Sequence, residues 1–448
     1  MKRIERWSLR YFMLRYFLFV IYRLTHRNII VTGLVNIPSK KPVILAPNHQ
    51  NALMDALAIV FSAPYEIVYL ARADIFRGRI VMALLNSIKI LPIYRIRDGK
   101  GSLEKNQEIF DVCVRILKEK KIFCVFPEAA HTNKKSILPH KKAIPRIVFQ
   151  TGELTNFELD IQIVPVGIYY THYYNFRRDL IVNYGEPISV RPYFDILREK
   201  GENEATRMLK ETIFEEQTKL CVHVPDKDSY DLYDQSFELL REKACEKLNL
   251  EHRPRNFVKA EQYIISKLKK YFENDKTMMQ ELLDTASSYI AGKKEIGILE
   301  SSFKKVVIGT KEIILFSFLT LILLPVILVG AIINGAIFWI TRYSYRSKIK
   351  DPQFYSSYSF VASIIVYPLW YLLLFFVFWI LLKSWWLSIL LIAISIPCGI
   401  VAFEMYQYLL RILNRIKYKR LRNQGNYDLF ELLRKRNKLI SRLGTIIE

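Results

Sequence analysis

The sequence predicts an α/β fold, in which a mixed sheet flanked by helices is followed by a helical insert and C-terminal transmembrane helices. Two features support this prediction. Short β-type runs alternate with helical patterns over residues 28–195, and three long uncharged apolar runs follow toward the C-terminus. Strands that alternate with helices are typical of a parallel or mixed sheet with covered faces.

The strands of this sheet are predicted from short apolar runs. Between the fourth and fifth of them, residues 102–121 have apolar side chains at helical spacing, which predicts a helix. The predicted strands are 28–34, 42–48, 66–71, 88–94, 121–127, 162–170 and 180–185.

The composition excludes several classes of protein. Of 448 residues, 51% are hydrophobic and 13% aromatic, which excludes a disordered chain. Five cysteines form no CxxC pair, which excludes a disulfide scaffold or zinc ribbon and fits a reducing compartment. Lys and Arg number 66 against 43 Asp and Glu, so the net charge of +23 indicates a membrane surface or a nucleic acid as partner.

The three apolar runs favour the membrane. Residues 313–340, 360–382 and 385–403 carry no charge, and about 20 apolar residues are enough to span a bilayer. Buried core helices are the alternative. Basic residues flank the last two runs at 342–350 and 411–420, so we expect a helical hairpin whose ends, like the α/β domain, lie on the cytoplasmic side.

The first apolar run has a less regular pattern, because lysines precede it as well as follow it. It is predicted to be a bent, re-entrant element with both ends cytoplasmic, and a tilted single span is the alternative. Four residues interrupt it: Pro325, Gly330, Asn334 and Gly335.

The remaining parts of the chain are predicted from charge and helical pattern. Residues 1–27 are expected to form an interfacial amphipathic helix on anionic lipid, with a poor transmembrane helix as the alternative. Residues 28–195 form the α/β domain, 196–305 a charged helical region and 306–410 the membrane segments. Residues 411–448 are a basic tail, with 11 Lys and Arg against three acidic residues, expected either at lipid headgroups or as a solvated helix.

The strongest local signal is the stretch 46–55, APNHQNALMD, which directly follows an apolar strand. A histidine at a strand end with an aspartate about one and a half helical turns later suits acid–base chemistry. Asp55 could hold the imidazole of His49, whose other nitrogen would take a proton from a hydroxyl. Alone, the pattern also fits an ordinary polar histidine.

Three further segments strengthen this interpretation because of their order along one α/β unit. One strand ends on Arg95, a planar cation that matches phosphate oxygens. Another ends on Pro127-Glu128 and is followed by a run of lysines that includes Lys134, and a third contains Pro165. Each alone has an ordinary structural explanation.

In this order the segments resemble the four motifs of the glycerolipid acyltransferase family, which includes bacterial lysophosphatidate acyltransferase. The resemblance covers about residues 28–190 and implies that His49 is the general base and Asp55 its orienting partner. It further implies that substrate contacts come from Arg95, Glu128, Ala129, His131, Lys134 and Pro165, the first five for the acceptor's phosphate and glycerol and Pro165 for the acyl donor.

Two departures from the family pattern stand out. Five residues separate His49 from Asp55 where the family usually has four, a spacing similar to a fungal branch of glycerol-3-phosphate and dihydroxyacetone-phosphate acyltransferases. The third motif normally continues Pro-Glu-Gly with a hydroxyl and a basic residue, whereas Ala129 and Ala130 follow Glu128 here. His131 or the nearby lysines could replace the usual basic group.

The resemblance therefore implies a membrane-bound acyltransferase that uses no cofactor. Its acyl donor would be acyl-CoA or an acyl carrier protein thioester, and its acceptor glycerol 3-phosphate or lysophosphatidate in phospholipid biosynthesis. Acylation of a lyso-aminolipid, or a non-catalytic membrane scaffold with a degenerate site, are the alternatives. The histidines show no paired metal-ligand spacing, and no nucleic-acid-binding motif is present, so neither metal nor nucleic acid is expected.

Overall fold

The computed structural model describes residues 8–73, 78–94, 102–303 and 310–448. Its contacts divide the chain into two units. The first contains Met1–Pro225, Arg253–Val258 and Asp351–Phe360, and the second contains the remainder. This division differs from the expected boundaries, because residues 196–225 and a short stretch between two apolar helices belong to the α/β unit.

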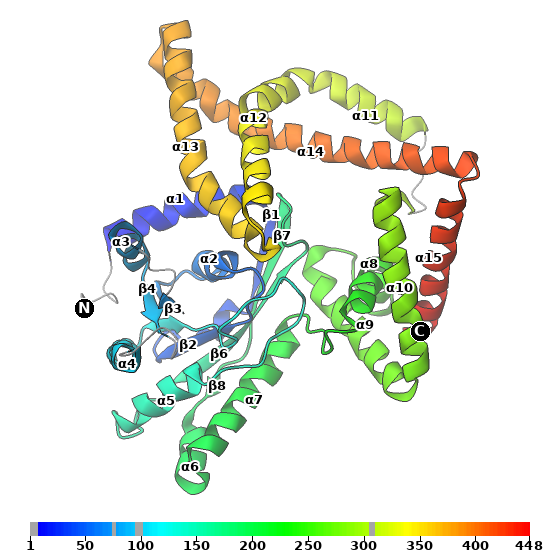
Figure 1. Cartoon of the computed structure of the whole chain (residues 1–448). Coiled ribbons are helices and arrows are strands. Elements are labelled where there is room, and N and C mark those ends of the chain that lie inside the picture. The colour runs from blue at the N-terminus through cyan, green and yellow to red at the C-terminus, as the bar shows by residue number, and fades with distance from the viewer. Residues whose placement is uncertain (1–7, 74–77, 95–101, 304–309) are drawn as a thin grey trace. The chain divides into compact units, whose positions relative to one another are not determined.

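An eight-stranded mixed sheet forms the centre of the first unit (Figure 1). Its strands lie in the order β1-β7-β6-β2-β5-β3-β4; β6 is antiparallel to β7 and β8, and the other pairings are parallel. The sheet confirms the predicted α/β class and all seven predicted strands. The bounds are β1 His26–Thr32, β2 Val43–Pro47, β3 Ile67–Arg72, β4 Ile90–Ile93, β5 Ile122–Cys124, β6 Gln162–Tyr170, β7 Arg178–Tyr184 and β8 Ile188–Ser189.

Helices cover the sheet and close its hydrophobic core. In β2, Ile44 and Ala46 point into a core shared with α4 to α7, while the alternating Val43 and Leu45 are buried on the opposite face, where α2 packs against β7. The helices of this unit are α2 Leu53–Ser62, α3 Arg79–Ser87, α4 Ser102–Lys118, α5 Ala143–Glu153, α6 Arg191–Lys200 and α7 Glu202–Leu220.

The N-terminal helix α1, Leu9–Thr25, is attached to α2 by an arginine. The guanidinium of Arg15 donates to the carbonyl oxygens of Val60 at 2.9 Å and Ala63 at 2.6 Å, at the carboxyl end of α2. A cation is favourable there because helix carbonyls carry partial negative charge. An interfacial position stays a prediction; the exposed side chains of α1 include Leu9, Phe12, Met13, Tyr16 and Phe17.

The second unit contains the helices α8 Tyr230–Lys247, α10 Lys276–Ile296 and α15 Tyr427–Ile446, together with most of α9 Pro254–Asn274. The expected basic tail ends in α15, which packs against α10 and α8 through buried leucines. Two of its cations form ion pairs within this unit: Arg436 with Glu300 at 2.7 Å and Lys438 with Glu281 at 2.6 Å. Attraction of the tail to lipid headgroups stays a prediction.

Three helices of the described chain are long and apolar enough to cross a membrane: α12 Leu324–Lys348, Pro352–Leu382 containing α13 Tyr355–Leu382, and α14 Trp385–Asn423. They are consistent with the predicted membrane integration. The apolar run 313–340 divides between α11, Thr310–Ile322, and α12, so the break falls just before Pro325. Whether this run re-enters or crosses the bilayer stays a prediction.

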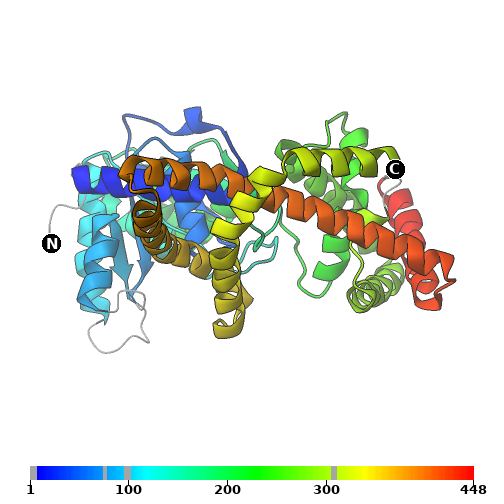
Figure 2. The same ribbon diagram turned by 90° about the horizontal axis from the view of Figure 1, so that it is seen from above.

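Gly330 and Asn334, expected to interrupt the first apolar run, instead join its helix to two others. Gly330 lies where α12 meets α14, and a Cβ there would be 2.2 Å from the carbonyl oxygen of Cys398. Asn334 donates to the carbonyl of Ser395 at 2.8 Å and accepts from the hydroxyl of Tyr371 in α13 at 2.6 Å. Small and polar side chains join membrane helices in this way, and Figures 1 and 2 both show α12 crossing α14.

Gly330→Ala is expected to destabilise the three-helix assembly by about 1–3 kcal/mol, because the added methyl meets backbone atoms that cannot rotate away. Thermal unfolding in detergent measures the effect. Gly335→Ala is the matched control, since a Cβ at Gly335 meets nothing within 4 Å. Equal unfolding temperatures for the two variants would contradict the close approach of α12 and α14.

Candidate active site

His49 and Asp55 form a hydrogen-bonded dyad at the carboxyl end of β2. The His49 Nδ1 lies 2.8 Å from Asp55 Oδ2, and the same oxygen accepts the backbone N–H groups of Gln50 at 2.7 Å and Asn51 at 2.6 Å. Asp55 is buried, whereas the His49 side chain is 17% exposed. Because Nδ1 donates to a carboxylate, Nε2 is the ring nitrogen that can accept a proton.

The loop that carries His49 is fixed to the neighbouring strand by Asn48, a residue that the sequence reasoning missed. Its buried side chain accepts the backbone N–H of Ile168 at 2.6 Å and donates to the same residue's carbonyl at 3.1 Å. Ala52 then turns the chain into α2 at φ 46°. The hydrophobic pattern of the sequence does not reveal this contact, because a single asparagine after a strand adds nothing to that pattern. Its burial explains the contact, since a buried amide requires hydrogen-bond partners.

Glu128 holds the backbone of His49. It follows β5, which is parallel to β2, so the two strands end at the same edge of the sheet. Its Oε1 accepts the His49 N–H at 2.7 Å, its Oε2 accepts the Leu138 N–H at 2.7 Å, and the Thr132 N–H lies 3.4 Å from the His49 carbonyl oxygen. The buried carboxyl group therefore binds protein backbone, and its predicted substrate contact stays a prediction.

Burial raises the pKa of Glu128 to about 8, although the N–H groups of Leu138 and His49 act in the opposite direction. A raised carboxyl pKa means that the folded state binds more protons than the unfolded state between the ordinary value and about 8. This contribution to stability is present at low pH and is lost as the pH rises through the folded value.

The unfolding temperature of the wild type is therefore expected to fall relative to that of Glu128→Gln as the pH rises from about 5 to about 9. The amide cannot ionise, so the variant lacks this contribution. Thermal scans of both proteins across this range measure the difference. A constant or rising difference would show that burial does not raise the pKa of this group.

Aromatic rings surround His49. Phe126, the second residue after β5, stacks on the imidazole with ring centroids 4.3 Å apart and planes at 27°. The ring of His131 lies 5.2 Å from that of His49 on a tilted plane. The structure thus brings His131 beside the dyad, while its predicted contact with substrate stays a prediction. It also adds Phe126, which the sequence reasoning did not single out.

The other predicted substrate-binding residues lie in different environments. Lys134 is exposed, while its neighbour Lys135 is buried with its Nζ 5.1 Å from the centre of the Tyr169 ring. Pro165 is buried within β6 in register with Ala46 of β2, so its contact with an acyl donor stays a prediction. Arg95 lies outside the described residues.

Ala129 occupies the position where the family pattern has glycine, and its φ of 53° is in the left-handed region. Ala129→Gly is expected to stabilise the protein by about 1 kcal/mol and to retain activity, because a Cβ is strained in this conformation. Denaturant unfolding measures the change. Ala130→Gly is the control, expected to be neutral or destabilising; stabilisation by Ala130→Gly alone would contradict the assignment.

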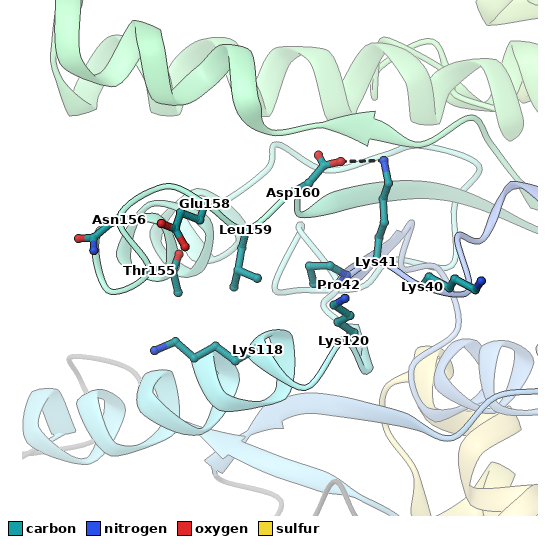
Figure 3. A pocket seen from close by; sticks show the side chains of 10 residues that line it. All are labelled: Lys40, Lys41, Pro42, Lys118, Lys120, Thr155, Asn156, Glu158, Leu159 and Asp160. Atoms are coloured by element: carbon teal, nitrogen blue, oxygen red, sulfur yellow. Dashed lines mark ion pairs between the residues drawn. The ribbon is translucent and has the colours of Figure 1, made fainter.

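A hollow of about 580 Å³ lies on the α/β unit, lined by lysines and loop residues (Figure 3). Among its lining residues, Pro42, Lys120 and Asp160 lie just before β2, β5 and β6, at the amino ends of three adjacent strands. His49 and Glu128 follow the carboxyl ends of β2 and β5, so this hollow is not part of the dyad's site. Within the described ranges, no three metal-binding side chains are grouped as ligands.

The fold and this site define a class: an α/β protein that presents a hydrogen-bonded His–Asp dyad at the carboxyl edge of its sheet. The family model described as Acyltransferase matches residues 28–169. These residues therefore match an acyltransferase-family domain, and they are similar in sequence to glycerolipid acyltransferases of the PlsC type.

Two known proteins are similar in sequence. The 1-acyl-sn-glycerol-3-phosphate acyltransferase of Borreliella burgdorferi is 28% identical over 174 residues, which are 38% of this chain and 63% of that protein. An uncharacterized acyltransferase of Schizosaccharomyces pombe is 24% identical over 103 residues, 23% of this chain and 15% of that protein. The chain thus matches less than two thirds of the length of either relative.

The crystal structure of the 1-acyl-sn-glycerophosphate acyltransferase PlsC from Thermotoga maritima aligns with 46% of this chain and 78% of that chain. The sequence identity of this alignment is 19% and its TM-score is 0.33.

Proposed function

We propose that this protein transfers a fatty acyl group from an acyl thioester to a hydroxyl group of a glycerol-phosphate acceptor at a membrane. The observation that carries the proposal is the dyad: His49 is partly exposed, with Nδ1 bound to the buried carboxylate of Asp55 and Nε2 available as a base. The acyltransferase domain match and the name of the Borreliella relative support the reaction type.

In the proposed reaction, His49 Nε2 takes the proton of the acceptor hydroxyl as its oxygen attacks the thioester carbonyl. Asp55 stabilises the imidazolium that forms. The tetrahedral intermediate then collapses, the carbon–sulfur bond breaks, and the thiolate takes the proton from His49. No acyl-enzyme is needed because the acceptor is itself the nucleophile, and general-base catalysis of this kind contributes about 10²–10⁴-fold.

The acceptor is proposed to be glycerol 3-phosphate or lysophosphatidate, and the donor acyl-CoA or acyl carrier protein. The exposed Lys134, three residues after the His131 ring that lies beside the dyad, is proposed to supply positive charge for the acceptor's phosphate. The five-residue spacing between His49 and Asp55 favours the glycerol-3-phosphate branch, whereas the Borreliella relative is named for the monoacyl acceptor.

We also propose that the catalytic unit lies on the cytoplasmic face. Residues 351–360 connect α12 to α13 and belong to the α/β unit, so this connection lies on the catalytic side of the membrane. Basic residues at 342–350 precede it, which indicates the cytoplasm. A reporter fused at Lys383, in the turn between α13 and α14, is expected on the opposite side; a cytoplasmic reporter there would contradict this topology.

The test of the reaction is acyl transfer by purified, detergent-solubilised protein. Labelled glycerol 3-phosphate and lysophosphatidate are each offered with acyl-CoA and with acyl carrier protein donors, for the wild type and for His49→Ala. Labelled lipid formed only by the wild type establishes the reaction and identifies both substrates. If folded wild-type protein gives no product with any pair, the glycerol-phosphate acceptor is wrong, and labelled lyso-aminolipid becomes the next substrate to test.

A further inference from the structure

A short connection between two apolar helices forms part of the α/β unit. This inter-helix segment, Asp351–Phe360, begins after α12 and includes the first residues of α13. Although it follows the sheet in the chain by more than a hundred residues, it reaches the loop that carries His49. Three independent contacts link it to the dyad.

The first contact is a helix cap supplied from a distant part of the chain. The backbone N–H of Leu53 donates to the Ser357 hydroxyl at 3.2 Å, across a separation of 304 residues. Leu53 is the first residue of α2, and the residue before it, Ala52, provides no side-chain cap. Since the first N–H groups of a helix lack partners within the helix, Ser357 satisfies one of them in the same turn that carries Asp55.

The second contact is made with a buried cation of β7. Arg178 in β7 is buried, and its Nη1 donates to the Ser356 hydroxyl at 2.8 Å and to the carbonyl of Tyr173. Burial lowers the pKa of Arg178, and nearby Tyr170, Tyr22 and Asp55 oppose that change. A buried guanidinium within electrostatic reach of the dyad carboxylate is therefore held in place by the inter-helix segment.

The third contact is made with His131, the ring beside His49. The ring of Phe354 meets that of His131 edge to face, with centroids 5.0 Å apart, and His131 in turn lies 5.2 Å from His49. The inter-helix segment is thus linked to His49 through the ring of His131, to the first turn of α2 through the Ser357 hydroxyl, and to Asp55 electrostatically through Arg178.

We propose that the inter-helix segment is a positioning element of the acyltransferase site and that Ser357 is its principal positioning residue. Ser357 touches neither His49 nor Asp55; it fixes the first turn of α2, which sets the distance between the histidine and its carboxylate. The catalytic part of this proposal rests on the proposed function, whereas the docking of the segment onto the loop does not.

The experiment compares Ser357→Ala, Ser357→Thr and Ser347→Ala in the full-length protein in detergent. Ser347 is the matched control because it is exposed in the preceding helix and its hydroxyl donates to the carbonyl of Ser344 in the same helix. Two kinds of measurement are made. Steady-state kinetics give kcat and the KM for both substrates, and stability measurements give the unfolding temperature and the hydrogen–deuterium exchange of the peptide covering residues 49–56.

Ser357→Ala is expected to lower kcat about 3- to 10-fold with little change in either KM, and to speed exchange in the loop peptide. Thr keeps the hydroxyl, so Ser357→Thr should restore both, and Ser347→Ala should match the wild type. Ser357→Ala with wild-type kcat and wild-type exchange would overturn the proposal, as would equal defects in the Ala and Thr variants.

The two readouts separate the proposals. If the wild type transfers no acyl group but Ser357→Ala still speeds exchange in the loop, the docking of the segment stands and the proposed reaction fails. If acyl transfer occurs and Ser357→Ala affects only the unfolding temperature, Ser357 has a structural role alone and the positioning proposal is wrong.

Discussion

His49→Ala is expected to lower acyl transfer by about 10³-fold or more while leaving the fold intact. The imidazole is partly exposed, so its removal leaves no large cavity, and the variant should unfold at nearly the wild-type temperature. Without the base, the acceptor hydroxyl must lose its proton to water. Product formation per folded protein, measured with saturating donor and acceptor, gives the loss.

The matched control is His252→Ala, because His252 is exposed and lies in the other unit. It should retain wild-type turnover. Residual activity of His49→Ala within tenfold of the wild type would remove His49 from its proposed role. Asp55→Asn adds a second check: its amide oxygen can still accept the bonds that Oδ2 accepts, but a neutral amide stabilises the imidazolium less, so turnover should also fall.

Glu128→Ala is expected to destabilise the α/β unit by about 2–5 kcal/mol and to abolish activity. The change leaves the backbone N–H groups of His49 and Leu138 without an acceptor, and burial prevents water from replacing the carboxyl group easily. Denaturant unfolding gives the stability, and turnover at low temperature, where the variant remains folded, gives the activity.

Glu128→Gln separates the effect of side-chain shape from that of hydrogen bonding. Glutamine has nearly the same shape as glutamate, but it keeps only one of the two acceptor oxygens. We expect it to lie between Glu128→Ala and the wild type in stability. Glu186→Ala, at an exposed carboxyl group of the same unit, should be neutral. If Glu128→Ala were as stable as the wild type but had a greatly raised KM for the acceptor, Glu128 would bind substrate rather than hold the loop.

The sheet could be predicted because each of its longer strands is an apolar run, which can be recognised from its own sequence without knowledge of the strands beside it. β8 was missed since two residues carry no periodicity. The approach of His49 to Glu128 also follows from the sequence in principle, because both residues follow strands that proved to be parallel neighbours. Which atoms would meet did not follow, so the hydrogen bond from the His49 N–H to the Glu128 carboxyl group was not predicted.

Contacts between distant segments were beyond sequence reasoning. Ser357 and Leu53 are each unremarkable in their local sequence, and only the folded chain brings them together. Gly330 and Asn334 were correctly recognised as unusual in an apolar run, and their low helix propensity predicted a break in the helix. In the structure both lie within α12, where they allow it to pack against α14. Similarly, residues 411–448 were interpreted from their charge alone, so the leucines through which α15 packs against the other helices of its unit were overlooked.

The position of the inter-helix segment has a consequence for biosynthesis. A chain emerging from the ribosome contains the whole sheet well before residues 351–360 are made, and α12 must be synthesised before them. The α/β unit can therefore bind residues 351–360 only after the first long apolar helix, α12, has left the ribosome. Since domains generally fold in the order of synthesis, folding of the α/β unit would be completed only after α12 has been synthesised, and a nascent chain stalled before that point would lack the Ser357 cap on the first turn of α2.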